Sequence, residues 1–335
     1  MHDLPADVSE AELREALLKW GVRSVSLAYA PVGFGDYHWS ARDDEGRRWF
    51  LTVADLANKP YCGEGTTAAH AGLLAAMDTA GALSAAGLDP VLAPLPTLDG
   101  ARLHRLGERY ALSVQPWVDA PSGAFGQRLT ARERADVMRV LASLHRSAPP
   151  APAPVLPPGL PGRRRLEAVL RGADDGWADG PFAGPARELL QERAAGLRDR
   201  LEEFDRRVAA LPTGAGALVV THGEPHPGNL LWGPDGGFRL VDWDTCGLAV
   251  PERDLWHVAL REDGGFDAEA LSVWAEESGR TPDPSALEFY RLRWDLDDLC
   301  AFLDVFRAPH GRSADTEASW GWLRETVARL VDGGR

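Results

Sequence analysis

Three side chains suited to phosphoryl transfer lie close together in residues 221–254. Glu224 and Asn229 lie on a loop rich in glycine and proline, and Asp242 follows a short apolar run. A carboxylate at Glu224 can orient an acceptor hydroxyl and take its proton. Asn229 and Asp242 supply hard oxygen ligands for Mg²⁺, which bridges and neutralises nucleotide phosphates. These residue types therefore indicate a site for phosphoryl transfer.

Two strands and a turn are needed to bring these loops together. The apolar run 217–220 predicts the end of a buried strand just before the Glu224 loop. Residues 230–232 and 238–241 flank a glycine-rich turn at 234–237, which is typical of a β-hairpin. The hairpin returns the end of the first loop, with Glu224 and Asn229, to the start of the next, with Asp242.

The pattern H-G-E-x-x-x-x-N followed by V-D-W-D resembles the catalytic and metal-binding loops of the aminoglycoside phosphotransferase and choline kinase family. In that family the loop carries Asp where this chain has Glu224, whereas the steps to Asn229 and Asp242 match. The PERDL run and residues 289–299 resemble spectinomycin-type phosphotransferases in particular. The alternative interpretation is a surface hairpin with incidental acids, which would require three matched positions and their strand context to coincide.

The resemblance implies an α+β, bilobal, protein-kinase-like fold. A small N-terminal antiparallel β lobe with a helix would span residues 1–118 and bind the nucleotide, with a hinge near 115–118. A larger, mainly helical C-terminal lobe would span 119–335 and carry the catalytic loop, the metal-binding loop and the substrate site. The backbone of Gln115 and Trp117 would read the adenine base at the hinge.

The first lobe reads as a meander of three strands, expected at 24–29, 38–42 and 48–53, followed later in the chain by a strand pair at 101–106 and 110–114. Gly33, Phe34 and Gly35 form a glycine loop between the first two strands, and the resemblance places this loop over the nucleotide phosphates. An ordinary hairpin turn is the alternative for these glycines. An alanine-rich helix is expected over 65–86, interrupted by Gly72 and Gly81.

The strand at 48–53 departs from the family, which usually places a phosphate-holding lysine in its middle. Thr52 stands at the matching position. The chain has only two lysines, Lys19 and Lys59, and we expect neither to lie near enough to be an obvious replacement. Alternation puts Arg48 on the same strand face as Thr52, so Arg48 could reach a phosphate, or it could simply face solvent at the strand end.

The second lobe opens with a predicted amphipathic helix over 130–147, capped by Thr130 and Glu133. Proline-rich residues 148–162 predict an extended crossing, and helices are expected at 163–170 and 184–211. Asp254 lies near the start of a further helix, where an acid is favoured. The resemblance makes Asp254 a brace for the catalytic loop, and His222 is expected to shape that loop through hydrogen bonds.

A substrate site is suggested by acids in the segment 289–299. Asp295 and Asp298 could hold the ammonium groups of a substrate by charge-assisted hydrogen bonds. The alternative is a solvated helix face, on which Arg291 with Asp295 and Arg293 with Asp297 form pairs spaced i,i+4.

Composition narrows the functional classes. The chain has 335 residues, 44% of them hydrophobic and 26% charged, and a formal net charge of −14. This charge disfavours nucleic acid and anionic membranes as partners but not a cationic small molecule. No apolar run reaches membrane-spanning length, and the acidic N-terminus lacks the features of a signal peptide. Three scattered cysteines fit a reducing cytoplasm.

We therefore expect an ATP- or GTP-dependent, Mg²⁺-dependent O-phosphotransferase acting on a small, cationic, hydroxylated molecule. The resemblance implies an aminoglycoside or aminocyclitol substrate and hence a role in antibiotic resistance. Choline or an amino sugar would suit the same lobes. A different class of protein, a pseudokinase that binds nucleotide or ligand without turnover, is the alternative raised by Glu224 and Thr52. The sequence gives no oligomeric state.

Overall fold

The computed structural model describes residues 1–5, 7–23, 26–173, 176–212, 214, 216–234 and 236–333. The chain forms two compact units. The first contains residues 1–156, 216–259 and 268–281, and the second contains residues 157–215, 260–267 and 282–335. The predicted lobe boundary near residue 118 is not a division between these units, and it stays a prediction. The combination of an antiparallel sheet with many helices confirms the predicted α+β class.

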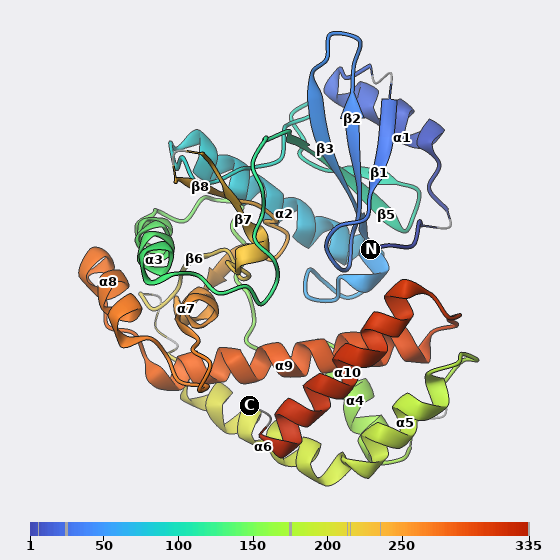
Figure 1. The fold of residues 1–335 in the computed structure, drawn as a ribbon, viewed down its shortest axis with the longest axis vertical. Helices are drawn as coiled ribbons and strands as arrows, with labels where there is room; N and C mark the ends of the chain where they lie inside the picture. Colours follow the sequence, from blue (N-terminus) through green and yellow to red (C-terminus); the bar gives the residue numbers. More distant parts are fainter. Residues whose placement is uncertain are drawn as a thin grey trace. The chain divides into compact units, whose positions relative to one another are not determined.

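An antiparallel five-stranded sheet in the order β1-β2-β3-β5-β4 dominates the first part of the chain (Figure 1). Its strands are β1 (Ser26–Ala30), β2 (Tyr37–Arg42), β3 (Arg48–Asp55), β4 (His104–Leu106) and β5 (Tyr110–Pro116). The predicted meander is confirmed in β1-β2-β3, although Ser24 and Val25 of its first predicted strand lie outside the described residues. The predicted strand pair forms as β4 and β5, with β5 next to β3 and with β4 beginning only at His104. The central pair, β3 and β5, aligns Thr52 with Ser113 and Phe50 with Gln115.

The two faces of this sheet differ in chemistry. One face carries Leu51 and Val53, which pack with Leu13 and Leu17 of α1 (Glu10–Leu17) in a buried apolar core. The opposite face carries Ala54, which packs against α2 (Thr66–Ala85). Because side chains alternate along a strand, Phe50 and Thr52 lie on this second face, beyond the part that α2 packs against.

Helix α2 runs unbroken, so the predicted interruptions at Gly72 and Gly81 are wrong. The two glycines serve close packing. A Cβ on Gly72 would lie 1.9 Å from the carbonyl oxygen of Cys62, and one on Gly81 would lie 1.9 Å from Arg102 Nε. Glycine within a helix lowers helix stability by about 1 kcal/mol relative to alanine. At these two positions the absence of a side chain lets neighbouring groups approach the helix backbone.

The remaining elements of the first unit include the predicted hairpin. Helix α3 (Ala131–Arg146) begins with the expected capping box of Thr130 and Glu133. Strands β7 (Leu230–Trp232) and β8 (Phe238–Leu240) form the hairpin, whose turn includes Asp235, a residue outside the described ones. Strand β6 (Val219–Thr221) pairs with β9 (Gly247–Ala249). Helices α7 (Glu252–Ala259) and α8 (Ala268–Ser278) follow. Single 3-10 turns are η1 (Leu18–Trp20), η2 (Leu56–Asn58) and η3 (Pro227–Asn229).

The second unit is helical. It contains α4 (Arg163–Leu170), α5 (Ala183–Glu192), α6 (Ala194–Ala210), α9 (Pro284–Arg307) and α10 (Ala314–Asp332). The single helix predicted over 184–211 is wrong in detail, because Arg193, with φ −98° and ψ 8°, separates α5 from α6. None of the helices that the structure describes is both long and apolar enough to cross a membrane. All three cysteines are free thiols.

Candidate active site

The β7–β8 hairpin holds the Glu224 loop beside Asp242. The backbone N–H of Val241 donates to the carbonyl oxygen of Asn229 over 3.1 Å. The side chain of Asn229 turns its Nδ2 toward the carbonyl oxygen of Glu224, 3.0 Å away. Because Nδ2 is occupied within the loop, Oδ1 is the atom of Asn229 that remains to ligate a cation. The structure thus gathers Glu224, Asn229 and Asp242 on one pair of loops.

His222 shapes this loop as a neutral side chain. Its Nδ1 accepts from the backbone N–H of Glu224 over 3.2 Å, so its Nε2 carries the proton and donates to the carbonyl oxygen of Val241 over 2.9 Å. The ring is fully buried, and burial lowers its pKa below the usual value. These bonds fit the supporting role expected of His222 and leave it no proton to exchange in a reaction.

Asp254 braces the same loop from α7. Its two carboxylate oxygens accept from the backbone N–H groups of His222, at 2.9 Å, and Gly223, at 2.6 Å. His145 Nε2 lies 3.0 Å from the same carboxylate, and Trp274 Nε1 donates to His145 Nδ1 over 3.0 Å. An indole is only a donor, so His145 Nε2 carries the proton and donates to Asp254.

The carboxylate of Asp254 is fully buried and fully engaged. Burial alone would disfavour its charge, but the hydrogen bond from His145, with help from the charge of Arg253, holds the pKa of Asp254 below its ordinary value. The brace therefore stays ionised, and its geometry fixes the backbone just before Glu224.

Only glycine fits at position 223. The residue has φ 103°, and a Cβ there would lie 2.4 Å from both Arg253 Nη2 and Thr245 Oγ1. The carbonyl oxygen of Gly223 accepts from His257 Nε2 over 3.0 Å, and Thr245 Oγ1 donates to the carbonyl oxygen of His222 over 2.8 Å. The catalytic loop is thus held by close contacts on both sides.

The environment of Asp242 favours the binding of a cation more than that of the other residues of the site. It has φ 65°, the one positive φ at a non-glycine position among the residues that the structure describes. The residue as a whole is exposed, although protein atoms crowd its carboxylate. The protein packed around it and the charges of Asp244 and Glu224 raise its pKa well above the ordinary value. With the free oxygen of Asn229 alongside, this crowded carboxylate fits a divalent metal ligand.

A buried ion cluster lies next to the metal-binding loop. Lys59 Nζ lies 2.7 Å from Asp244 Oδ2 and 3.0 Å from Asp36 Oδ2, and all three residues are buried. Tyr61 completes the cluster, because its hydroxyl lies 2.5 Å from Asp244 Oδ2 and 2.9 Å from Lys59 Nζ. Asp244 is two residues from Asp242, and Asp36 directly follows the glycine loop. Lys59 therefore joins the two loops expected to face the nucleotide.

The expectation that neither lysine lies near the site is wrong for Lys59. Sequence distance misled that inference, since Lys59 is 185 residues from Asp244. The composition contains a signal that could have pointed to Lys59. The chain has only two lysines among 36 basic residues, so each lysine is a candidate for a specific role. Lys19 is exposed, whereas Lys59 is 4% exposed.

The nucleotide-facing predictions fall on the second face of the sheet and its margins. Thr52 is buried, and its hydroxyl lies 3.2 Å from His38 Nδ1. Gln115 donates through Nε2 to Ser113 over 3.0 Å, while its Oε1 is buried without a hydrogen-bond partner. Gly33 and Gly35 have φ 69° and 97°, which only glycine adopts readily. Met1 lies against this loop, because its amino group donates to the carbonyl oxygen of Gly33 over 2.9 Å and its sulfur accepts from the N–H of Gly35 over 3.4 Å. Phe34, between the two glycines, is exposed.

Arg48 is directed to the predicted hinge. Its guanidinium carbon lies 3.7 Å from the ring centroid of Trp117, and its Nη1 lies 3.2 Å from Asp119 Oδ1. Trp117 Nε1 donates to the same carboxylate over 2.7 Å. These contacts give Arg48 partners other than a phosphate, and its suggested phosphate role stays a prediction.

The two suggested substrate acids lie on α9, in the second unit. Asp295 pairs with Arg329 over 2.9 Å and not with Arg291, which pairs with Glu288 over 2.8 Å. The predicted pair of Arg293 and Asp297 forms, at 3.2 Å. Asp298 is half-buried. The substrate role of Asp295 and Asp298 stays a prediction.

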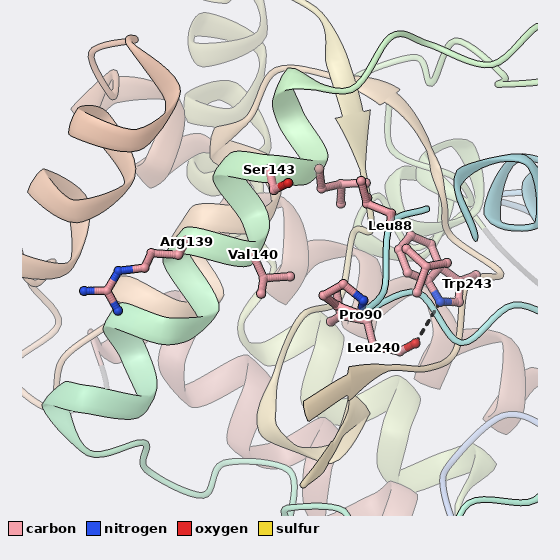
Figure 2. Close-up of a pocket in the computed structure, with 9 residues that line it drawn as sticks. Leu88, Pro90, Arg139, Val140, Ser143, Leu240 and Trp243 are labelled. Carbon is pink, nitrogen blue, oxygen red and sulfur yellow. Dashed lines mark hydrogen bonds between the residues drawn. The ribbon is translucent and has the colours of Figure 1, made fainter. Parts of the chain in front are cut away.

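A separate apolar cavity of about 220 Å³ lies behind the hairpin (Figure 2). Leu88, Pro90, Val140 and Leu240 line it, and Trp243 closes one side while donating from Nε1 to the carbonyl oxygen of Leu240 over 3.0 Å. Among the residues that the structure describes, no carboxylate lines this cavity, so it is distinct from the acidic site. Trp243 is nevertheless shared, since it separates Asp242 from Asp244 in the chain.

The fold and the site together define a phosphotransferase with a kinase-like fold. The model of the phosphotransferase enzyme family matches residues 30–290, and the chain belongs to that family. Protein StrN of Streptomyces griseus is 31% identical over 250 residues, which cover 71% of this chain and 72% of that protein.

Solved structures share the fold over almost the whole chain. Spectinomycin phosphotransferase APH(9)-Ia, in complex with ADP and spectinomycin, matches with a TM-score of 0.73 at 17% identity and covers 98% of this chain and 99% of that one. A microcompartment-associated aminopropanol kinase matches with a TM-score of 0.60 at 18% identity, covering 98% and 99%. Amicoumacin kinase hAmiN, in complex with AMP-PNP and Ca²⁺, matches with a TM-score of 0.60 at 14% identity, covering 97% and 93%. These likenesses confirm the predicted kinase-like fold and family resemblance.

Proposed function

We propose that the protein transfers the γ-phosphoryl group of ATP to a hydroxyl of a small, cationic molecule. The observation that carries this proposal is the placement of Glu224, Asn229 and Asp242 on two loops that Asp254 and the hairpin hold rigidly together. Preorganised groups of this kind contribute most of the rate enhancement in phosphoryl transfer, which needs positioning and charge neutralisation more than covalent chemistry.

Glu224 orients the acceptor hydroxyl and takes its proton. Its side chain is 31% exposed, so a substrate can reach it, and its backbone on either side is fixed by His222 and Asn229. The carboxylate of Asp242 and Oδ1 of Asn229 would hold Mg²⁺. When bound, Mg²⁺ neutralises the phosphates and the charge that develops between them and the acceptor.

The nucleotide base occupies the second face of the sheet, against Thr52 and the hinge at Gln115 and Trp117. The glycine loop of Gly33 to Gly35 covers the phosphates, because its missing side chains let backbone N–H groups approach. Complexes of related folds with ADP and AMP-PNP support nucleotide binding at such a site. GTP is the alternative donor.

The acceptor is proposed to be an aminoglycoside or aminocyclitol, which would make the activity one of antibiotic resistance in the cytoplasm. The net charge of −14 favours a cationic acceptor. The spectinomycin and aminopropanol kinases with the same fold support this class. An amino alcohol of the choline type is the second acceptor class.

The test is a phosphorylation screen with Mg·ATP and Mg·GTP. Spectinomycin, other aminoglycosides, aminopropanol and choline are offered in turn, and phosphorylated product is detected by mass spectrometry. Glu224→Gln should reduce turnover roughly a hundredfold or more while leaving nucleotide affinity unchanged. Exposed Glu45→Gln is the matched control. Full turnover by Glu224→Gln would remove the general-base role.

A pseudokinase is the rival, and Glu224 favours it. Glutamate reaches one methylene further than the family's aspartate, and a misplacement of about 1 Å can cost roughly a hundredfold in rate. Nucleotide binding without turnover on any acceptor of the screen would favour that rival. Absence of nucleotide binding under all conditions would remove the phosphotransferase proposal itself.

A further inference from the structure

The second face of the sheet lacks the lysine that kinase-like folds use to hold phosphate. Among the described residues of β2, β3 and β5 on that face, His38, Thr52, Ser113 and Gln115 are uncharged or only weakly basic. The two arginines that β2 and β3 place on that face, Arg42 and Arg48, lie opposite each other at the ends of these strands, four residues from Thr52 along β3. Arg48 is committed to Trp117 and Asp119. A nucleotide triphosphate at this face therefore needs a cation from another element.

Lys59 is that cation by position. It follows β3 and the short turn η2, and its ammonium lies between Asp36, at the end of the glycine loop, and Asp244, in the metal-binding loop. The phosphates are proposed to lie between these same two loops. Lys59 is also the cation that reduces the crowding of negative charge around Asp242.

The cluster holds Lys59 in the way that protein kinases hold their phosphate-binding lysine. There an acidic side chain pairs with the lysine and presents it to the nucleotide. Here Asp244 takes that part, with the shortest contact of 2.7 Å and a second bond from Tyr61. Asp36 is held less completely, since its Oδ1 is buried without a hydrogen-bond partner.

We propose that Lys59 binds the phosphates of the nucleotide, replacing the strand lysine that is missing at Thr52. On nucleotide binding the ammonium keeps its ion pairs with Asp244 and Asp36 and exchanges the N–H that donates to the Tyr61 hydroxyl for a bond to a phosphate oxygen. Three N–H donors permit this exchange without leaving Asp244 unpaired. The inference rests on the proposed function, because it assumes a nucleotide phosphate at this site.

The experiment compares a ligand that has phosphates with one that lacks them. Calorimetry on the full chain measures the Kd of Mg·AMP-PNP and of adenosine for the wild type, Lys59→Met and the exposed control Lys19→Met. We expect Lys59→Met to weaken Mg·AMP-PNP roughly tenfold to a hundredfold, the usual loss for a charge-assisted hydrogen bond. Adenosine affinity should change less than threefold, and Lys19→Met should match the wild type.

Lys59→Met leaves two buried carboxylates without their cation and could unfold the chain. The double variant Lys59→Met with Asp244→Asn removes one charge of each sign, and its melting temperature shows whether the fold is kept. It should lose Mg·AMP-PNP affinity while keeping that for adenosine. Adding Thr52→Lys to Lys59→Met should restore at least part of the lost affinity, and no recovery would contradict a replacement of the strand lysine.

The outcomes separate the two proposals. Equal weakening of both ligands in a folded variant, or no weakening of either, would overturn the role of Lys59 while leaving the phosphotransferase proposal in place. Failure of the wild type to bind Mg·AMP-PNP would overturn both.

Discussion

Two aspartates on neighbouring segments of the first unit show opposite states of a carboxylate. Asp254 is fully buried, accepts hydrogen bonds from two backbone N–H groups and from His145, and has a lowered pKa. Asp242 is open to solvent, lies among other carboxylates, and has a raised pKa. The difference shows that hydrogen bonds within the protein stabilise the charge of Asp254, which holds the loop. The charge of Asp242, which is proposed to act in the reaction, is left to be neutralised by a ligand.

The largest expected effect is on turnover at Asp242. Asp242→Asn should lower kcat/KM by roughly a thousandfold, about 4 kcal/mol of transition-state stabilisation, because the metal ligand is lost. The same change should leave the melting temperature equal or higher, since it removes like-charge repulsion. Steady-state kinetics and thermal unfolding check the two halves. A marked loss of thermal stability would show that Asp242 is satisfied within the protein, as Asp254 is.

Asp254→Asn should mainly lower the stability of the fold, whereas Asp242→Asn should mainly lower turnover. Asparagine has one carbonyl oxygen for the three buried donors that Asp254 satisfies, and each donor left unsatisfied costs about 1–3 kcal/mol of unfolding free energy. Urea denaturation measures this loss. The matched control is Asp263→Asn. Asp263 pairs with Arg261 at the surface with 59% of its side chain exposed, and such pairs contribute about 1 kcal/mol or less. Equal losses in both variants would remove the special role of the brace.

Binding of a cation should stabilise the fold, because it neutralises the carboxylates that are crowded around Asp242. Mg²⁺ with AMP-PNP should raise the unfolding free energy by about 2.7 kcal/mol at a ligand concentration of a hundred times Kd. Asp242→Asn should lose most of this gain, whereas Asp263→Asn should retain it. A thermal-shift titration with and without EDTA provides the measurement. Stabilisation by the nucleotide alone, without dependence on Mg²⁺, would contradict the metal assignment.

The smallest expected effects are changes of stability with pH. They have opposite signs at His257, beside the catalytic loop, and at Asp36, in the ion cluster. Burial lowers the pKa of His257, which bonds to the catalytic loop, well below its ordinary value. Below about pH 6.5 the unfolded chain therefore binds more protons at this residue, and stability falls by up to about 1.4 kcal/mol per pH unit. His257→Gln should flatten this fall while an amide donor to Gly223 is retained.

Asp36 in the ion cluster should instead increase the stability of the fold as the pH falls. Burial raises its pKa to about 6, so below pH 6 the folded chain binds more protons at this residue and gains stability, down to the ordinary value near 4. Asp36→Asn should make the loss of stability between pH 6 and 4 steeper. Denaturation curves at several pH values compare both variants with the wild type. Two variants with shifts of the same sign would contradict the comparison of the regions.

Much of this architecture is readable in the chain because it depends on local chemistry. The capping box at Thr130, the hairpin at 230–240 and the β strands all follow from spacing over a few residues. The break at Arg193 and the unbroken course of α2 were missed. Both depend on what packs against the helix, as Cys62 and Arg102 do against Gly72 and Gly81.

The candidate site divides in the same way. The sequence by itself determined the family resemblance and the residues Glu224, Asn229 and Asp242, because a short loop and a hairpin place them together. Only the tertiary structure decided the partners of these residues. Lys59 meets Asp244 across 185 residues, and His145 meets Asp254 across 109. Such polar pairs carry no signature in sequence spacing, since the fold of distant segments, and not the local chain, brings the two groups within hydrogen-bonding distance.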